Sequence, residues 1–133
     1  MKYPKGQHPP LDAKKHDALA TESEFLAELI EYARTLGWRV AHFRPSMTSR
    51  VDKNGKPVWV TPVQADGAGF PDLVLVRDGR LLFVEAKSAK GKLSEAQQQW
   101  LNSLSGAAMG SNARIGVYEW RPSDWPAIEK VLE

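Results

Sequence analysis

The sequence predicts an α/β fold in which a central mixed β-sheet is flanked by helices. Two apolar runs, LVLV and LLFV, lie on either side of Asp78-Gly79, and this pattern is the strongest short-range signal of a β-hairpin. Segments with apolar residues at helical spacing stand before and after the hairpin, and each is followed by a short strand pattern. The order helix, strand, hairpin, helix, strand, helix is typical of helices packed on a mixed sheet.

The composition excludes several kinds of site. With 133 residues, the chain is long enough to bury a core without disulfides or a structural metal. The sequence has no cysteine, which excludes thiol catalysis and zinc sites built on cysteine, and which fits a cytoplasmic location. The formal net charge of +2 does not predict a nucleic-acid binder by bulk charge, so any such surface must be local.

The N-terminal segment differs in character from the rest of the chain. Residues 1–20 combine three prolines with scattered lysines, and we expect them to form a flexible arm. They contain no continuous apolar run, so we expect no signal peptide, no membrane span and no membrane partner. Residues 21–133 are expected to form a single domain.

The domain is expected to begin with an amphipathic helix and a strand. Thr21 and Glu24 have the spacing of a capping box, and Gly37 ends the helical pattern. The apolar stripe between them consists of Phe25, Leu26, Leu29, Ile30, Ala33 and Leu36. WRVAHFR, from Trp38 to Arg44, predicts a strand.

The remaining segments follow in order. Residues 45–69, rich in proline, glycine and polar residues, are expected to form a long loop, and loops of this length are usually functional or disordered. After the hairpin, KLSEAQQQWLNSL predicts a second helix with Ser94 as its N-cap. ARIGVYEW, residues 113–120, predicts a strand, and RPSDWPAIEKVLE predicts a short closing helix.

The hairpin turn fixes which residues face one another. A two-residue turn at Asp78-Gly79 places Asp72 opposite Glu85, with β-carbons about 4.5–5.5 Å apart. Because strand side chains alternate, Lys87 shares the face of these two acids. The other residues of this face are Val74, Val76, Leu81 and Phe83. Two opposed carboxylates destabilise a sheet unless a cation lies between them or one carboxyl keeps its proton.

A divalent cation is the simplest partner for the facing acids. Hard ions such as Mg²⁺ bind carboxylate oxygens, and Lys87 can reach the same position. The apolar runs beside Asp72 and Glu85 are expected to be buried on both faces of the sheet, which favours this interpretation over exposed strand-end charges paired in solvent. Glu22 lies on the apolar side of the first helix, although the same position suits an ordinary glutamate in a first turn.

These residues resemble a known nuclease signature. Pro71-Asp72, twelve residues and then Glu85-Ala86-Lys87 resemble the PD-(D/E)xK pattern. Together with TESEFLAELIEYARTLGW, GKLSEAQQQWL and YEWRPSDW, the chain from about Thr21 onward is similar to stand-alone VRR-NUC domain proteins. The resemblance implies a restriction-endonuclease-like fold and a Mg²⁺- or Mn²⁺-dependent DNA endonuclease. It further implies action on branched DNA, of Holliday-junction or flap type, in repair, recombination or replication, by a homodimer.

The resemblance also implies roles for single residues. Asp72 and Glu85 would bind the metal together with the backbone carbonyl of Ala86, and Lys87 would orient or activate the attacking water. Glu22 would correspond to an acid of the first helix that holds a second metal or a metal-bound water.

A further helix residue and a basic surface complete the expected site. Gln97 matches a glutamine that contacts the water shell of the metal or the scissile phosphate. Phosphate binding needs cations, and the candidates lie near the hairpin end and along residues 45–69. They are Arg44, Arg50, Lys53, Lys90 and Lys92. We expect residues 45–69 to lie over duplex or branched DNA and to order on binding, while a solvated insertion remains the alternative.

Two other functions stay open. The chain could be a catalytically weak DNA-binding module of the same fold, although such a module has no reason to keep Asp72, Glu85 and Lys87 together. It could also be an acid-pair hydrolase that acts on another substrate, but this leaves Lys87 without a role.

Overall fold

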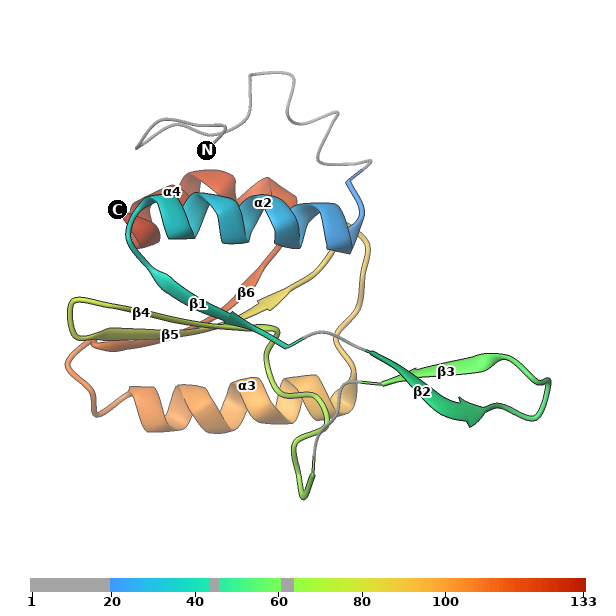
Figure 1. The fold of residues 1–133 in the computed structure, drawn as a ribbon. Helices are drawn as coiled ribbons and strands as arrows, with labels where there is room; N and C mark the ends of the chain where they lie inside the picture. The colour runs from blue at the N-terminus through green and yellow to red at the C-terminus, as the bar shows by residue number, and fades with distance from the viewer. Residues whose placement is uncertain (1–19, 44–45, 61–63) are drawn as a thin grey trace.

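In the computed structural model, residues 20–43, 46–60 and 64–133 are described, so the predicted arm up to residue 19 and Arg44 lie outside the described residues. A four-stranded sheet lies between two helical layers, with α2 and α4 on one face and α3 on the other (Figure 1). The elements are α2 (Glu22–Thr35), β1 (Arg39–His42), β2 (Ser46–Val51), β3 (Pro57–Val60), β4 (Leu73–Arg77), β5 (Arg80–Ala86), α3 (Glu95–Ala108), β6 (Ile115–Trp120), the 3-10 helix η1 (Pro122–Asp124) and α4 (Trp125–Leu132).

The sheet is mixed, as the sequence predicts. Its strand order is β1-β4-β5-β6, with β1, β4 and β5 antiparallel and β6 parallel to β5. The connection from β5 to β6 runs through α3, because parallel neighbours need a crossover. The predicted hairpin register is confirmed, since Arg77 faces Arg80 and Val74 faces Phe83.

The main core lies between the sheet and the layer formed by α2 and α4. The apolar stripe of α2 is buried against one face of the central hairpin, and Trp125 of α4 meets Phe25 and Tyr32 edge-on, with ring centroids 5.9 and 5.6 Å apart. The hairpin residues of this face are Leu73, Leu75, Leu82 and Val84, each at most 1% exposed. Each such side chain contributes roughly 1.5–3 kcal/mol on burial.

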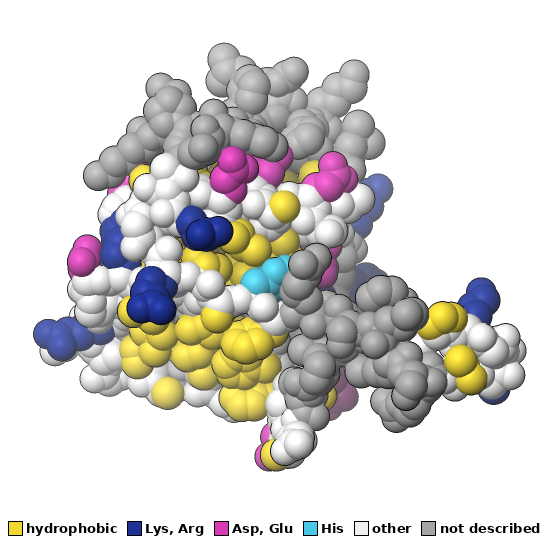
Figure 2. All heavy atoms as spheres, in the orientation of Figure 1, with side chains coloured by type: hydrophobic (Ala, Val, Ile, Leu, Met, Phe, Trp, Pro, Cys, Tyr) yellow, Lys and Arg dark blue, Asp and Glu magenta, His cyan; other side chains and the backbone are white. Residues whose placement is uncertain are grey.

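The other face of the sheet is only partly covered, and the expectation that the hairpin runs are buried on both faces is wrong there. Val76 is 44% exposed, and Val74 and Leu81 are half-buried. The reason is that α3 packs on β6, toward one side of the sheet, so the surface of β1 and β4 keeps exposed apolar side chains (Figure 2).

The turn end of the hairpin is fastened to α4. The guanidinium of Arg77 donates to the carbonyl of Leu132 at 2.9 Å, and Arg80 donates to that of Val131 at 3.0 Å. The indole of Trp38 donates to the Leu132 carbonyl at 2.9 Å and lies under both guanidinium groups. Cations at the carbonyl end of a helix are favourable, so this end of the hairpin is held firmly.

Part of the segment expected as a long loop forms a two-stranded ribbon. β2 pairs antiparallel with β3, and Figure 1 shows the ribbon projecting away from the sheet. Its turn is ordered by Asp52, whose Oδ1 accepts the N–H groups of Asn54 and Lys56 at 2.8 and 3.0 Å. The ribbon was not predicted because SMTSRV lacks the alternation that a strand shows when one side is buried. None of the described helices is long and apolar enough to cross a bilayer.

Candidate active site

The predicted acids gather where β5 ends. Because β4 and β5 are antiparallel, Asp72 just before β4 lies beside the end of β5, where Glu85 and Lys87 follow one another at alternate positions. Both α2 and α3 begin at this end of the sheet (Figure 1). The first turns of these helices bring Glu22 and Gln97 to the same place. The structure therefore assembles all five side chains that the sequence proposed as catalytic.

Asp72 is held by backbone on both sides. Its Oδ2 accepts the N–H of Ala86 at 3.0 Å, and its own carbonyl accepts the N–H of Phe43 at 3.0 Å. Phe43 thus holds the backbone of Asp72, and β5 holds its carboxyl, which faces Glu85 as the hairpin register predicts. The position of Asp72 is therefore determined by hydrogen bonds to the backbone beside it on both sides.

Gly69 explains how the residues before Asp72 reach this place. Its φ of +84° lies in the left-handed region that favours glycine. A β-carbon there would stand 2.6 Å from the backbone carbon of Ala96 and 2.8 Å from the nitrogen of Gln97. The glycine of GFPD therefore lets the chain pass directly against the first turn of α3.

Glu85 is the most unusual group of the site. Its residue is 1% exposed, and burial, followed by the neighbouring carboxyl of Asp72, raises its pKa to about 9. Its Oε1 is buried without a hydrogen-bond partner among the described residues. The neutral form of this carboxyl is therefore favoured, with a hydrogen bond to the Asp72 carboxyl adding to the preference, and Oε1 is the oxygen that the described residues leave for a ligand.

Lys87 connects the acids of the sheet to α2. Its Nζ lies 3.8 Å from Oε2 of Glu85 and 3.8 Å from Oε1 of Glu22, and its side chain is only 10% exposed. Partial burial raises the pKa of Glu22, with Lys87 opposing the shift and Asp72 adding to it. The ammonium group thus lies between two acids and away from bulk water.

Gln97 reaches Glu85 because of the way α3 is capped. Its side-chain carbonyl accepts the N–H of Ser94 at 2.8 Å, and Ser94 Oγ accepts the N–H of Gln97 at 3.1 Å. This capping box folds the amide back over the helix start, where Nε2 donates to Oε2 of Glu85 at 3.3 Å. The Ser-Glu-Ala-Gln pattern in the sequence is a signal for this geometry.

The residues present fit a hard divalent cation, although they do not form a dense cluster. Asp72 and Glu85 offer carboxylate oxygens beside the backbone of Ala86, which are the ligands that Mg²⁺ and Mn²⁺ take in proteins. The orphaned Oε1 of Glu85 is the observation that favours this fit. No three histidine, aspartate or glutamate side chains gather closely enough to hold an ion in the described ranges, and Glu22 interacts with the other acids through the ion pair with Lys87 and through the charge of Asp72.

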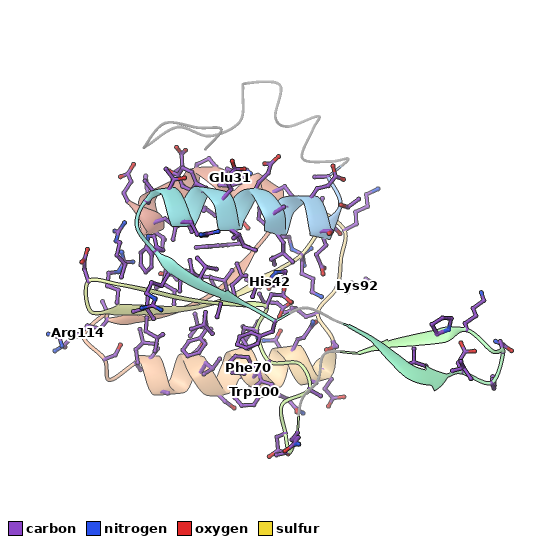
Figure 3. All side chains as sticks on the ribbon, viewed as in Figure 1. Glu31, His42, Phe70, Lys92, Trp100 and Arg114 are labelled. Atoms are coloured by element: carbon purple, nitrogen blue, oxygen red, sulfur yellow. The ribbon has the colours of Figure 1, made fainter. Side chains whose placement is uncertain are left out.

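The basic residues predicted to bind DNA fall in two places. Lys90 and Lys92 are exposed on the connection from β5 to α3, which begins directly after Lys87, and Figure 3 shows Lys92 on this connection. Lys53 is exposed at the turn of the ribbon. Arg50 lies in β2, where only the backbone is described, and Arg44 lies outside the described residues. The first pair therefore follows Lys87 on the connection that leaves the end of β5, whereas Lys53 lies on the ribbon that projects from the sheet.

Two features of this region were not predicted from the sequence. Arg121, directly after β6, donates to backbone carbonyls of the segment that follows Lys87. Phe70 lies between Phe43 and Trp100, with ring centroids 5.7 and 5.1 Å away, and so joins the start of β4 to α3 (Figure 3). Neither pattern repeats at helix or strand spacing, so periodicity carries no signal for them.

Comparison with known families gives one match. Residues 38–117 match the family model described as VRR-NUC domain, which covers more than half of the chain and includes Asp72, Glu85, Lys87 and Gln97. Comparisons with curated proteins and with solved structures each found no match.

Proposed function

Because the chain belongs to the VRR-NUC domain family of the PD-(D/E)xK nuclease superfamily, we propose that it is a divalent-metal-dependent endonuclease that hydrolyses phosphodiester bonds in branched DNA. The observation that carries the proposal is Glu85, which is buried against Asp72 with one oxygen unpartnered and an ammonium group 3.8 Å from the other. Acids alone do not explain this arrangement, whereas a cation and a phosphate do.

The metal would be held by Asp72, Glu85 and the carbonyl of Ala86. A bound Mg²⁺ or Mn²⁺ would supply a Lewis acid for the phosphate and would lower the pKa of a coordinated water. Asp72 is prepared for this role because Ala86 N–H already fixes one of its oxygens at 3.0 Å. Loss of the proton from Glu85 would accompany binding, since only the carboxylate is a good ligand.

The neighbouring side chains would act on the phosphate. The nearly buried ammonium of Lys87 faces a position where negative charge develops during attack on phosphorus, and partial exclusion of water strengthens that interaction. Gln97 holds one oxygen of Glu85, and Glu22 holds Lys87 from the opposite side. The proposed role of Glu22 is thus to orient the lysine or a water beside it.

The DNA is proposed to cross the end of β5 and α3. Exposed Lys90 and Lys92 would contact phosphates beside the cleaved bond. The ribbon of β2 and β3, with Lys53 at its turn, would reach along the duplex, because a two-stranded ribbon fits the major groove. Its projection from the sheet supports this role.

We further propose that two copies act together. The partly covered sheet face, with Val76 44% exposed next to the edge strand β1, offers an apolar surface to a second copy. A two-fold dimer would present two active ends, which suits paired cuts in a junction.

A cleavage panel tests the proposal. Purified wild type is incubated with single-stranded, duplex, flap and four-way-junction DNA in Mg²⁺ or in EDTA. We expect cleavage of the branched substrates in Mg²⁺ only, and a loss of at least about a thousandfold in Asp72→Asn with DNA binding retained. Asp78→Asn, the same change at the exposed turn of the hairpin, is the control.

Other outcomes have distinct meanings. Binding of DNA by wild type without cleavage in either Mg²⁺ or Mn²⁺ would favour the DNA-binding module. Cleavage by Asp72→Asn at the rate of wild type would show that the assigned acids are not the catalytic ones.

A further inference from the structure

The segment that follows Lys87 folds into a tight turn at the end of the sheet. Gly91 N–H donates to the carbonyl of Ser88 at 3.2 Å. Lys90 and Lys92, both exposed, lie within and just after this turn. The turn therefore carries the cations that the proposed function needs, and its position decides where they stand.

The turn is held from outside by one side chain. Nη1 of Arg121 donates to the carbonyls of Ser88 at 2.7 Å and Gly91 at 2.6 Å, with a longer contact to that of Ala89 at 3.4 Å. Hydrogen bonds from a charged donor are the strong ones, so this side chain sets the path of the backbone.

Arg121 is itself fixed in direction. Its Nη2 donates to Oε2 of Glu119 at 2.8 Å, and its backbone N–H donates to Oδ2 of Asp124 at 2.8 Å, where η1 begins. The planar guanidinium can serve the carboxylate and the carbonyls at once, which the ammonium group of a lysine at this position could not do.

The turn also touches the lysine of the proposed active site. The N–H of Lys87 donates to the Trp120 carbonyl at 2.9 Å. The residue before the turn is therefore bonded to the residue before Arg121. A β-carbon on Gly91 would lie 3.0 Å from Ser88 Oγ and 3.5 Å from Cδ of Lys87. The turn thus packs along the aliphatic stem whose ammonium group contacts Glu85.

We infer that Arg121 is a positioning residue that acts through Lys87. The arginine clamps the turn of residues 88–91 and so holds the Lys87 ammonium between the acids of β5 and α2. This role rests on the proposed nuclease function, but the clamp itself is a property of the metal-free protein. It concerns a residue to which the signature gives no role: Arg121 lies in the YEWRPSDW stretch that carries the resemblance, but after residue 117, where the matched family segment ends.

The first test compares Arg121→Lys with Arg114→Lys. Both changes keep the charge, and Arg114 lies just before β6, at the opposite end of the sheet from Lys92 (Figure 3). We expect Arg121→Lys to lower kcat on saturating branched DNA by about tenfold or more with KM changed less than about threefold, because misplacement of a catalytic group affects the chemical step. Arg114→Lys should match wild type in both constants.

The second measurement does not need activity. Hydrogen exchange in EDTA should quicken at the amides of Lys87 and Gly91 in Arg121→Lys, while the amides of β4 keep their protection. A merely structural role would instead loosen the whole sheet or leave the turn unchanged. This measurement separates failure of the clamp from failure of the proposed function, since it decides the clamp even if wild type cuts no DNA.

A second pair of variants moves the turn without touching the arginine. Gly91→Ala should lower kcat by a few-fold, because its methyl group would stand 3.0 Å from Ser88 Oγ and so displace the turn that packs along the Lys87 stem. Adding Ser88→Ala to Gly91→Ala should restore part of the rate by removing the hydroxyl. Faster exchange at the turn with kcat unchanged in Arg121→Lys, or unchanged exchange there, would overturn the inference.

Discussion

At the scale of single residues, Glu85 is the buried carboxyl whose pKa is raised most. Its carboxyl lies at the end of a central strand, where burial favours the neutral form and a neighbouring acid adds to the effect. Ionising such a buried group is costly, and a bound cation would offset this cost. The same geometry gives the residue a measurable signature in the absence of metal.

That signature is a dependence of stability on pH. The pKa of Glu85 is raised from 4.5 to about 9 in the folded protein, so the folded state binds this proton more tightly than the unfolded state. Its favourable contribution is complete below about pH 4.5 and is lost as the pH rises toward 9. In EDTA, thermal melts of Glu85→Gln should therefore gain on wild type steadily from pH 5 to pH 9.

A matched variant isolates the effect. Glu95→Gln makes the same change at an exposed position in the first turn of α3 and should leave the pH dependence of wild type intact. Melting curves of Glu85→Gln and wild type that stay parallel across this pH range would show that Glu85 titrates normally.

At the scale of secondary structure, the start of α3 has two tasks. Ser94 caps the helix, and the same motif turns the Gln97 amide toward Glu85. Stability and site geometry therefore share one set of hydrogen bonds. Leu101 is the single buried residue of α3, so packing alone does little to fix where the helix begins. The capping box fixes that position.

Removing the cap should cost a defined amount of stability. Ser94→Ala is expected to lower the free energy of unfolding by about 1 kcal/mol, since the N–H of Gln97 loses its acceptor. Urea denaturation measures the change. Ser103→Ala, at an exposed position within the same helix, is the control and should leave the midpoint unchanged or slightly raised, because alanine is the better helix former. Equal midpoints for the two variants would contradict the role of the cap.

Much of this architecture follows from local sequence patterns, and the exceptions have a physical reason. The Asp78-Gly79 turn fixed the hairpin register, and with it the facing of Asp72 and Glu85, because strand pairing is determined by the turn. The ribbon and the clamp of Arg121 could not be predicted in this way. SMTSRV in the ribbon lacks the alternation of a half-buried strand, and Arg121 bonds to backbone carbonyls, which every residue has, so YEWRPSDW gives no sign of which carbonyls the side chain reaches.

At the scale of the whole molecule, the uneven covering of the sheet predicts how copies associate. One face is closed by α2 and α4, while the opposite surface of β1 and β4 keeps Val76 and Ala41 exposed beside half-buried Val74. Val76→Asp should convert a dimer to a monomer in analytical ultracentrifugation, with the melting temperature of the monomer little changed, because the side chain is outside the core. Val51→Asp, at an exposed position on the ribbon, is the control.

A wild-type protein that sediments as a monomer at micromolar concentration would remove the dimer from the proposal. It would leave the assignment of the acids untouched, since Asp72, Glu85 and Lys87 all come from one chain.

The ribbon enters and leaves the sheet at a single point. His42 and Leu73 are cross-strand partners, and the N–H of Phe43 donates to the carbonyl of Asp72. The segment between Phe43 and Asp72 therefore starts and ends at residues that are hydrogen-bonded to each other. Lengthening such a segment costs little, about 0.6 kcal/mol for each doubling. A change in the length or charge of the ribbon, residues 46–60, can therefore alter the proposed contacts with nucleic acid, while Gly69 and Phe70 keep their packing on α3 and the acids keep their places.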